Sequence, residues 1–350
     1  MRTRGRRLLP VRGARLVRAL LLAALAKGLP APSPAAAQET HALIVVGIGG
    51  EDKYRERFHE WGGKIRSALV DKHGVRPERV VYLAERPETD PAAIRGPSTK
   101  ANLEATLREM AQAAGPSDRI LVVLIGHGTA TGQDAQINLA GPDLSGAELD
   151  GLLGLFATQE VALVNTASAS GPFVGALSGT RRVVVAATRS GQERNETWFG
   201  QYFAEALSGD GADLDKDGAV SLFEAFEFAR REVERHYQEQ NLLLTEHAVL
   251  DDDGDGTGSA ELTAAAGDGA LARRFQLGSP ARAAARAGAE GVTDPALRAL
   301  LAQKEELEVK IEGLRLRRDS MDPAAYDQEL ETLLVELALL NRRIRDAGGG

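Results

Sequence analysis

Two polar sequences near the middle of the chain contain residue types that carry out acid–base and nucleophilic chemistry. The first, Gly-His-Gly at 126–128, directly follows an apolar run at 120–125, and the second, with Ser168, closely follows an apolar run at 161–164. A well-placed histidine accepts the proton of a serine hydroxyl as that hydroxyl attacks a carbonyl carbon. His127 and Ser168 therefore form a candidate catalytic pair if the fold brings them together.

The elements around these residues predict that both lie at one edge of a sheet. Apolar β-branched runs of this length are typical of buried parallel strands, and their alternation with helices predicts an α/β domain with a mostly parallel, helix-covered sheet. The carboxyl ends of parallel strands lie at the edge where ligands bind, so His127 and Ser168 are expected there. The expected strands are 41–48, 79–83, 120–125, 161–164 and 182–188, and the expected helices are 54–73, 99–114, 146–156, 198–207 and 222–237.

Several segments between 41 and 258 resemble the caspase and legumain superfamily of cysteine peptidases, in particular bacterial legumain-like proteins. The matching segments are the turn and helix start at 45–55, the helix start at 98–103, the His127 sequence, the segment 137–144 and the strand at 183–188. This resemblance implies a caspase-like fold with a dyad of His127 and Ser168. It also implies an oxyanion site that includes the backbone N–H of Gly128, and a substrate-pocket role for Arg55.

Two departures from the family pattern concern the chemistry itself. Ser168 stands where the family has a cysteine, and Gly49 stands where legumains have an asparagine that helps to organise the histidine. A thiol has a pKa of about 8.5 and readily becomes a thiolate beside a histidine. A serine hydroxyl instead needs an aligned base, usually held by a third group, for which Asp134 is one candidate.

The sequence leaves two functions open. One is a catalytically impaired peptidase homologue that acts as a binding or scaffold module for a peptide or protein ligand. The other is an active hydrolase in which Ser168 is the nucleophile and His127 the general base.

An acidic segment after the helix at 198–207 has the ligand pattern of an EF-hand. Calcium binds six to eight oxygens, which such a loop supplies from positions one, three, five, seven, nine and twelve, with glycine at position six. Helices on both sides provide the expected context. The sequence therefore predicts Ca2+ within 213–224, bound by Asp213, Asp215, Asp217, the carbonyl of Ala219, Ser221 and Glu224, with Gly218 at position six.

A second acidic run at 251–258 repeats only the first half of that pattern. Asp251, Asp253 and Asp255 occupy positions one, three and five, but position twelve is Leu262. Because the bidentate glutamate is missing from its place, we expect either a weak second calcium site or a rigid acidic turn.

The first 37 residues read as a signal peptide, which predicts a periplasmic or secreted protein. They hold eight basic residues and no acid, followed by an apolar stretch that is too short to span a bilayer as a retained anchor. Removing them leaves 34 of the 42 basic residues against 50 acidic ones, a net charge of −16, which disfavours a nucleic-acid partner. The chain contains no cysteine, so neither disulfides nor a thiol nucleophile are available.

The remaining organisation follows from composition and periodicity. We expect the α/β domain to occupy 38–267, an Ala- and Gly-rich linker 268–292, and a helical hairpin 293–346. Each hairpin helix begins with Asp-Pro, and its apolar residues recur in coiled-coil-like steps of three and four. The hairpin is expected either to mediate homo-oligomerisation or partner binding, or to fold back on its own domain.

Overall fold

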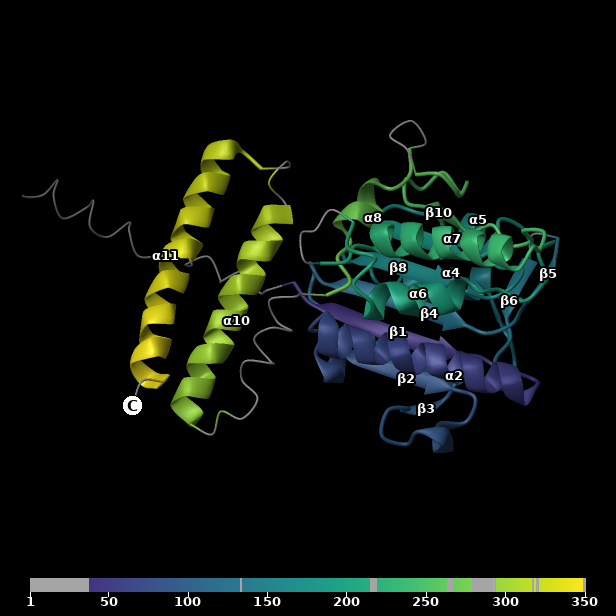
Figure 1. Cartoon of the computed structure of the whole chain (residues 1–350), viewed down its shortest axis with the longest axis horizontal. Coiled ribbons are helices and arrows are strands. Elements are labelled where there is room, and N and C mark those ends of the chain that lie inside the picture. Colours follow the sequence, from purple (N-terminus) through teal and green to yellow (C-terminus); the bar gives the residue numbers. More distant parts are fainter. Residues whose placement is uncertain are drawn as a thin grey trace, which may run out of the picture. The chain divides into compact units, whose positions relative to one another are not determined.

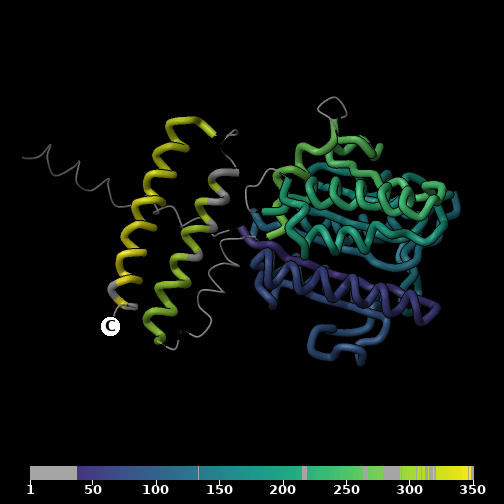
Figure 2. Tube along the Cα trace, viewed as in Figure 1, coloured from purple at the N-terminus to yellow at the C-terminus, as the bar shows by residue number. Residues whose placement is uncertain are grey.

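The computed structural model describes residues 38–132, 134–214, 219–262, 267–278, 292, 294–316, 318 and 321–348 (Figure 2). The predicted signal peptide and the greater part of the predicted linker lie outside these described residues. The parts described below are an α/β domain and a helical hairpin.

A seven-stranded sheet with the order β10-β9-β8-β4-β1-β2-β3 forms the centre of the α/β domain (Figure 1). All neighbouring pairs are parallel except β10 with β9, so the sequence correctly predicts a mostly parallel sheet. The strands are β1 Thr40–Val46, β2 Val80–Ala84, β3 Gly96–Pro97, β4 Arg119–Ile125, β8 Glu160–Asn165, β9 Arg182–Ala186 and β10 Val249–Asp251. A small antiparallel sheet contains β5 Gly128–Thr131, β6 Asp134–Ile137 and β7 Leu144–Ser145.

Helices cover both faces of the large sheet, because each central strand is apolar on both of its sides. In β1, Ala42, Ile44 and Val46 belong to one buried cluster, whereas Leu43 and Val45 belong to the other. The first cluster includes residues of α2 Asp52–Ser67, its π-helical extension Ala68–Lys72, α6 Phe199–Ser208, α7 Leu222–Glu239 and α8 Ala270–Arg274. The second includes residues of α3 Lys100–Ala113, α4 Gly146–Leu153 and α5 Pro172–Leu177. Short 3-10 helices occupy Pro77–Arg79 and Pro87–Thr89.

The packed part of the domain extends further than the sequence suggests. Residues 268–278 were expected to begin the linker, but Phe275 and Leu277 are both 0% exposed within the core. Gln276 also forms an isolated antiparallel bridge with Ser221. The domain therefore continues to at least Gly278. The Ala and Gly content of this stretch resembles that of a linker, but its two large apolar side chains, Phe275 and Leu277, are buried in the core.

The C-terminal residues form the expected helical hairpin of α10 Pro295–Leu316 and α11 Pro323–Gly348. Asp294 and Asp322 accept hydrogen bonds from the N–H groups of Ala296 and Ala325 at 2.8 and 3.1 Å, as the Asp-Pro starts predict. Among the described residues, no helix combines the length and the apolar character needed to cross a membrane.

Candidate active site

The register of the sheet brings the two polar sequences to the same level. Leu124 of β4 lies opposite Asn165 of the adjacent parallel strand β8. His127 and Ser168 each follow these paired residues by three positions, at the carboxyl edge of the sheet. The sequence prediction that the two residues share one edge therefore agrees with the strand pairing.

The His127 ring is held mainly by aromatic side chains from α2. The ring centroids of Tyr54 and Phe58 lie 4.8 and 5.1 Å away, and both rings meet the imidazole edge to face. Burial lowers the pKa of His127 below its usual value, while a hydrogen bond to the backbone of Gly49 and the charge of Glu51 oppose that change. A lowered pKa keeps the imidazole neutral at neutral pH, which is the form that acts as a general base.

Gly49, whose backbone contributes to the pKa of His127, lies in a turn that has no room for a side chain. A Cβ atom at this position would lie 2.6 Å from the backbone nitrogen of Arg55, so no side chain fits without a shift of the turn. Asp134 is exposed and pairs with Thr131 at the far end of the β5–β6 hairpin. Its position is about 10 Å along the strand from Ile137, which pairs with Gly128 next to His127. Gly49, and not Asp134, therefore contacts the histidine.

The Ser168 side chain faces the backbone of Gly128. Its Oγ lies 3.5 Å from both the nitrogen and the carbonyl oxygen of Gly128, and the residue is 6% exposed. A Cβ atom at Gly128 would lie 2.4 Å from the carbonyl oxygen of Ser168, so only glycine permits this approach. Within the described residues, no hydrogen bond joins Ser168 Oγ to the His127 ring.

The residues after Ser168 are fixed by buried hydrogen bonds. Ala169 has a positive φ of 53°, and its N–H donates to the carbonyl oxygen of Glu193 at 2.8 Å. Ser170 Oγ lies 3.2 Å from Thr188 Oγ1, which also accepts from the N–H of Gly171 at 3.0 Å. Sequence reasoning did not identify Glu193 or Thr188, and the only signal for Thr188 was its place at the end of the strand at 182–188.

The backbone N–H of Gly128 lies near the buried hydroxyl of Ser168, and the neutral imidazole of His127 lies at the same edge of the sheet. The N–H of Gly128 points toward Ser168 Oγ, 3.5 Å away. The hydroxyl lacks the direct hydrogen bond to a base that serine nucleophiles use. Proton transfer from Ser168 to His127 would first require a hydrogen bond between the two side chains.

Arg55 is engaged by acidic and backbone groups in the turn after β1. Its Nε lies 3.1 Å from a carboxylate oxygen of Glu85, and its guanidinium also pairs with Asp52 and donates to the carbonyl of Gly50. These contacts fasten the turn that carries Gly49. A substrate group would have to compete with Glu85 and Asp52 for this side chain.

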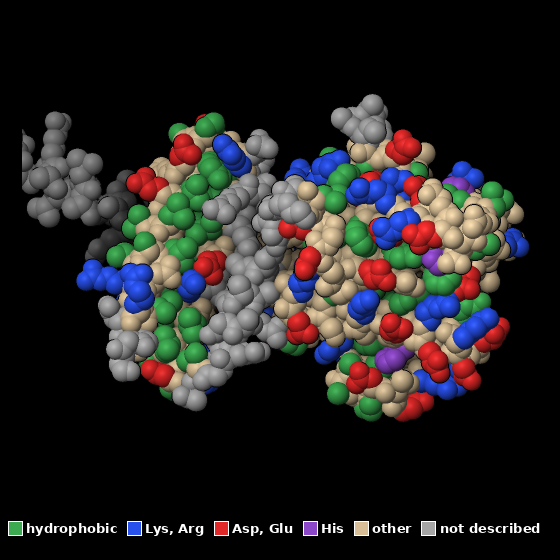
Figure 3. Space-filling view, viewed as in Figure 1, with side chains coloured by type: hydrophobic (Ala, Val, Ile, Leu, Met, Phe, Trp, Pro, Cys, Tyr) green, Lys and Arg blue, Asp and Glu red, His purple; other side chains and the backbone are tan. Residues whose placement is uncertain are grey.

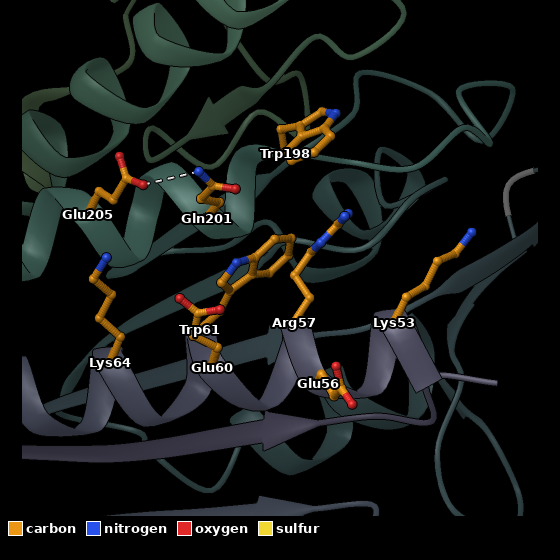
Figure 4. Close-up of a pocket in the computed structure, with 9 residues that line it drawn as sticks. All are labelled: Lys53, Glu56, Arg57, Glu60, Trp61, Lys64, Trp198, Gln201 and Glu205. Carbon is orange, nitrogen blue, oxygen red and sulfur yellow. Dashed lines mark hydrogen bonds between the residues drawn. The ribbon is translucent and has the colours of Figure 1, made fainter. Parts of the chain in front are cut away.

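A groove of about 360 Å³ runs between α2 and α6 (Figure 4). Arg57 lies at 4.7 Å over the ring of Trp198 and forms an ion pair with Glu196, which accepts a hydrogen bond from Tyr54 at 3.3 Å. Trp198, with Arg57 stacked on it, thus forms an aromatic wall of the groove. Arg57 is connected through Glu196 to Tyr54, whose ring contacts His127. Its lining combines basic, acidic and aromatic side chains: Lys53, Glu56, Arg57, Glu60, Trp61, Lys64, Trp198, Gln201 and Glu205.

The structure describes the two ends of the predicted calcium loop, whereas Asp215, Asp217 and Gly218 lie outside the described residues. Glu224, the predicted bidentate ligand, is buried and directs both oxygens at the loop backbone. Oε1 accepts from the N–H of Leu214 at 2.8 Å, and Oε2 accepts from the N–H of Ser221 at 2.8 Å. Asp213 and Ala219 lie in the described ends of the loop, before and after the gap.

The second acidic run forms a tight turn in which three carboxylates converge. Single oxygens of Asp251, Asp253 and Asp255 lie within 4.8 Å of one another. The buried Asp251 accepts hydrogen bonds from the N–H groups of Gly254 and Gly256 at 3.0 and 2.9 Å. Burial, and secondarily the charge of Asp268, raise the pKa of Asp251. The geometry is compatible with both expectations for this segment, a rigid turn and a weak cation site.

Comparison with models of protein families finds no match, and comparison with curated proteins finds none either. Among solved structures, the chain is similar to a protein from Geobacter sulfurreducens, with a TM-score of 0.43 and 12% identity over 69% of this chain and 99% of that one. It is also similar to caspase-1 from Spodoptera frugiperda, with a TM-score of 0.41 and 10% identity over 64% of this chain and 94% of that one. Similarities this distant assign no activity, so function has to be argued from the site residues.

Proposed function

We propose that the chain is an exported, calcium-binding protein with a caspase- or legumain-like α/β domain, whose cleft binds a peptide or protein ligand and has lost efficient cleavage. The observation that carries this proposal is the position of the Ser168 hydroxyl. It faces the Gly128 backbone at 3.5 Å and makes no hydrogen bond to His127 among the described residues. A serine that is not aligned with its base is a poor nucleophile.

The binding part of the proposal rests on the surfaces around the dyad. The N–H of Gly128 offers a donor for a carbonyl group, and the adjacent groove supplies aromatic and charged walls of a kind that holds extended peptides. These features do not depend on whether the residue at 168 is serine or cysteine. A ligand can therefore occupy the cleft without being cut.

A serine hydrolase is the second candidate, and the contact between Gly49 and His127 favours it. That contact orients the imidazole, which is the task of the third group in a serine triad. In this mechanism His127 takes the proton of Ser168 Oγ as the oxygen attacks the substrate carbonyl. The N–H of Gly128 stabilises the resulting oxyanion, and the proton then passes to the leaving group.

A fluorophosphonate probe distinguishes the two functions, because it labels only serines that are activated as nucleophiles. We expect no labelling of the purified protein beyond that of the matched Ser168→Ala variant. In parallel, immobilised protein should retain peptides from a random library that mass spectrometry finds uncut. Labelling that disappears in Ser168→Ala would reject the impaired-peptidase proposal and establish the hydrolase.

The calcium part of the proposal is supported by the ligand pattern and by the orientation of Glu224. The carboxylates in the loop repel one another in a chain of net negative charge, and a divalent cation relieves that cost. The loop residues fit such an ion because their donors are oxygens. Binding to the folded state alone stabilises it by about 2.7 kcal/mol when calcium is at a hundredfold excess over its dissociation constant.

Thermal melts of the purified protein with calcium and with chelator, beside Glu224→Gln and Asp255→Asn, test the assignment of the calcium site. Calcium should raise the melting temperature of the wild type and of Asp255→Asn, whereas Glu224→Gln should lose the shift. A shift retained in Glu224→Gln but lost in Asp255→Asn would move the site to 251–255. Equal melting temperatures with calcium and with chelator would reject calcium binding. Export is tested separately, by determining whether the protein recovered from cells begins at Gln38.

A further inference from the structure

Helix α11 has a second apolar surface besides the one that faces α10. The surface toward α10 consists of the residues that the coiled-coil-like spacing predicts, and Tyr326 and Leu340 on it are buried. On other sides of the same helix, Leu334 and Val335 are 44% and 54% exposed, and Leu339, which borders the groove between α10 and α11, is 60% exposed. With exposed Ala338 they follow the spacing i, i+1, i+4 and i+5, so they form one contiguous patch. Figure 3 shows apolar side chains gathered along the hairpin helices.

Charged residues of opposite sign stand at the two ends of this patch. Asp327 and Glu331 precede it, and Arg342 and Arg345 follow it. These four residues and the patch recur in steps of three and four, which places them on the same side of the helix. All four side chains are exposed, and none forms an ion pair within the part of the chain that the structure describes. The surface is therefore acidic at its beginning, apolar in its middle and basic at its end.

We propose that this surface binds the same surface of a second copy of the chain, with the two α11 helices antiparallel. A two-fold axis between residues 336 and 337 places Glu331 opposite Arg342 of the second copy, and the reciprocal pair forms at the other end. The same register places Leu334 opposite Leu339 and Val335 opposite Ala338. Apolar side chains thus meet at the centre, and opposite charges meet at positions 331 and 342 on either side of it. At the outermost positions the same register places Asp327 opposite position 346, which is also an aspartate, so the attraction comes from the pairs of Glu331 with Arg342.

The polarity of the charges selects this arrangement over the parallel one. In a parallel pair in register, Glu331 would face Glu331 and Arg342 would face Arg342, which is unfavourable. The antiparallel pair converts both repulsions into attractions. The surface is thus complementary to itself only in the antiparallel orientation.

The pairing is tested by reversing the charge of Glu331 or Arg342 and then mixing the two variants, because each residue should contact the other one in the second copy. The purified wild type should sediment with the mass of two chains. Glu331→Arg alone and Arg342→Glu alone each place like charges at both rims, and should weaken dimerisation by at least about tenfold. An equimolar mixture of the two variants should recover the dimer, because every rim pair then has opposite charges. The double variant Glu331→Arg/Arg342→Glu should also dimerise.

Arg343→Glu is the matched control, since it makes the same charge change one residue away and on another side of the helix. It should leave the dimer intact, and circular dichroism should show unchanged helix content in every variant. A monomeric wild type across the sedimentation concentration range would overturn the proposal. Dimers that resist both single reversals would place the interface elsewhere, and a mixture that stays monomeric would reject the antiparallel register. None of these results depends on the chemistry at Ser168, so they are separable from the proposed function.

Discussion

The His127 and Ser168 sides of the candidate site are held in different ways. On the histidine side, the reactive ring itself is fixed, between the edges of Tyr54 and Phe58 and the backbone of Gly49. On the serine side, the following backbone is fixed through Glu193 and Thr188, while the reactive hydroxyl makes only long contacts to Gly128. The contacts that fix the backbone after Ser168 do not involve its hydroxyl oxygen, so they would also hold the backbone with a different atom at that position.

Introducing a thiol at position 168 should produce the largest effect. We expect Ser168→Cys to raise peptide cleavage by at least about a hundredfold over wild type, because a thiolate needs no base aligned during attack. The chain has no other cysteine, so alkylation by iodoacetamide reports on this thiol alone. Its rate at pH 7 should be at least about tenfold higher than in the same variant with His127→Ala. Equal alkylation rates would show that the imidazole does not reach position 168.

Forcing the two sides apart should have the next largest effect. Gly128→Ala places a Cβ atom 2.4 Å from the carbonyl oxygen of Ser168, and should lower the free energy of unfolding by about 3 kcal/mol. Gly63→Ala in α2 is the matched control, because nothing lies within 4 Å of its Cβ position, and it should be neutral or stabilising. Urea denaturation measures both. A Gly128→Ala variant as stable as wild type would mean that the close approach is not maintained.

Loosening only the serine side should cost less. Thr188→Val removes the hydroxyl that accepts from Gly171 and contacts Ser170, and should reduce the free energy of unfolding by about 2 kcal/mol. In the Ser168→Cys background, Thr188→Val should reduce the difference in alkylation rate between the protein with His127 and the protein with His127→Ala. Thr188→Ser, which keeps the hydroxyl, should lose much less stability. If the serine and valine variants are equally destabilised, lost packing rather than the hydrogen bonds explains the result.

Counted per pH unit, the smallest expected effect is a pH dependence in the segment around Glu246. Glu246 accepts hydrogen bonds from the N–H groups of Trp198 and Phe199 at 2.8 Å, and burial, with a smaller contribution from Glu193, raises its pKa to about 8. Between its ordinary pKa of 4.5 and that value, the folded state holds a proton that the unfolded state releases. Stability therefore falls as the pH rises through this window, by at most about 1.4 kcal/mol per pH unit.

Glu246→Gln removes this titration because the amide stays neutral. Thermal melts from pH 5 to about pH 8 should show a flatter decline in the variant than in wild type, whatever the offset between the two curves. The slope is the informative quantity, since the amide also replaces one acceptor by a donor. Parallel curves would show that Glu246 is already ionised in the fold at low pH.

The sequence predicts best what depends on local periodicity and strand order. Apolar runs identify the central strands and the hairpin helices, and the parallel arrangement is sufficient to place His127 near Ser168. The sequence does not reveal the Gly49 contact or the docking of Ala169 on Glu193, because both use backbone groups that every residue has. It also misses the three-residue strand β10, which is too short to show a period.

The pairing of Val220 and Leu222 with residues 275–277 has a consequence for how the protein is synthesised. Leu222 donates to the carbonyl of Phe275 at 2.9 Å, and Leu277 donates to the carbonyl of Val220 at 3.2 Å. The pairs among β1, β4 and β8 can all form once residue 165 has left the ribosome. The hydrogen bonds of Val220 and Leu222 with residues 275–277 can form only after more than a hundred further residues have been synthesised. A nascent chain halted before Phe275 would therefore carry a complete central sheet and an open start of α7. The contacts of Val220 and Leu222 with residues 275–277 would then be among the last of the α/β domain to form.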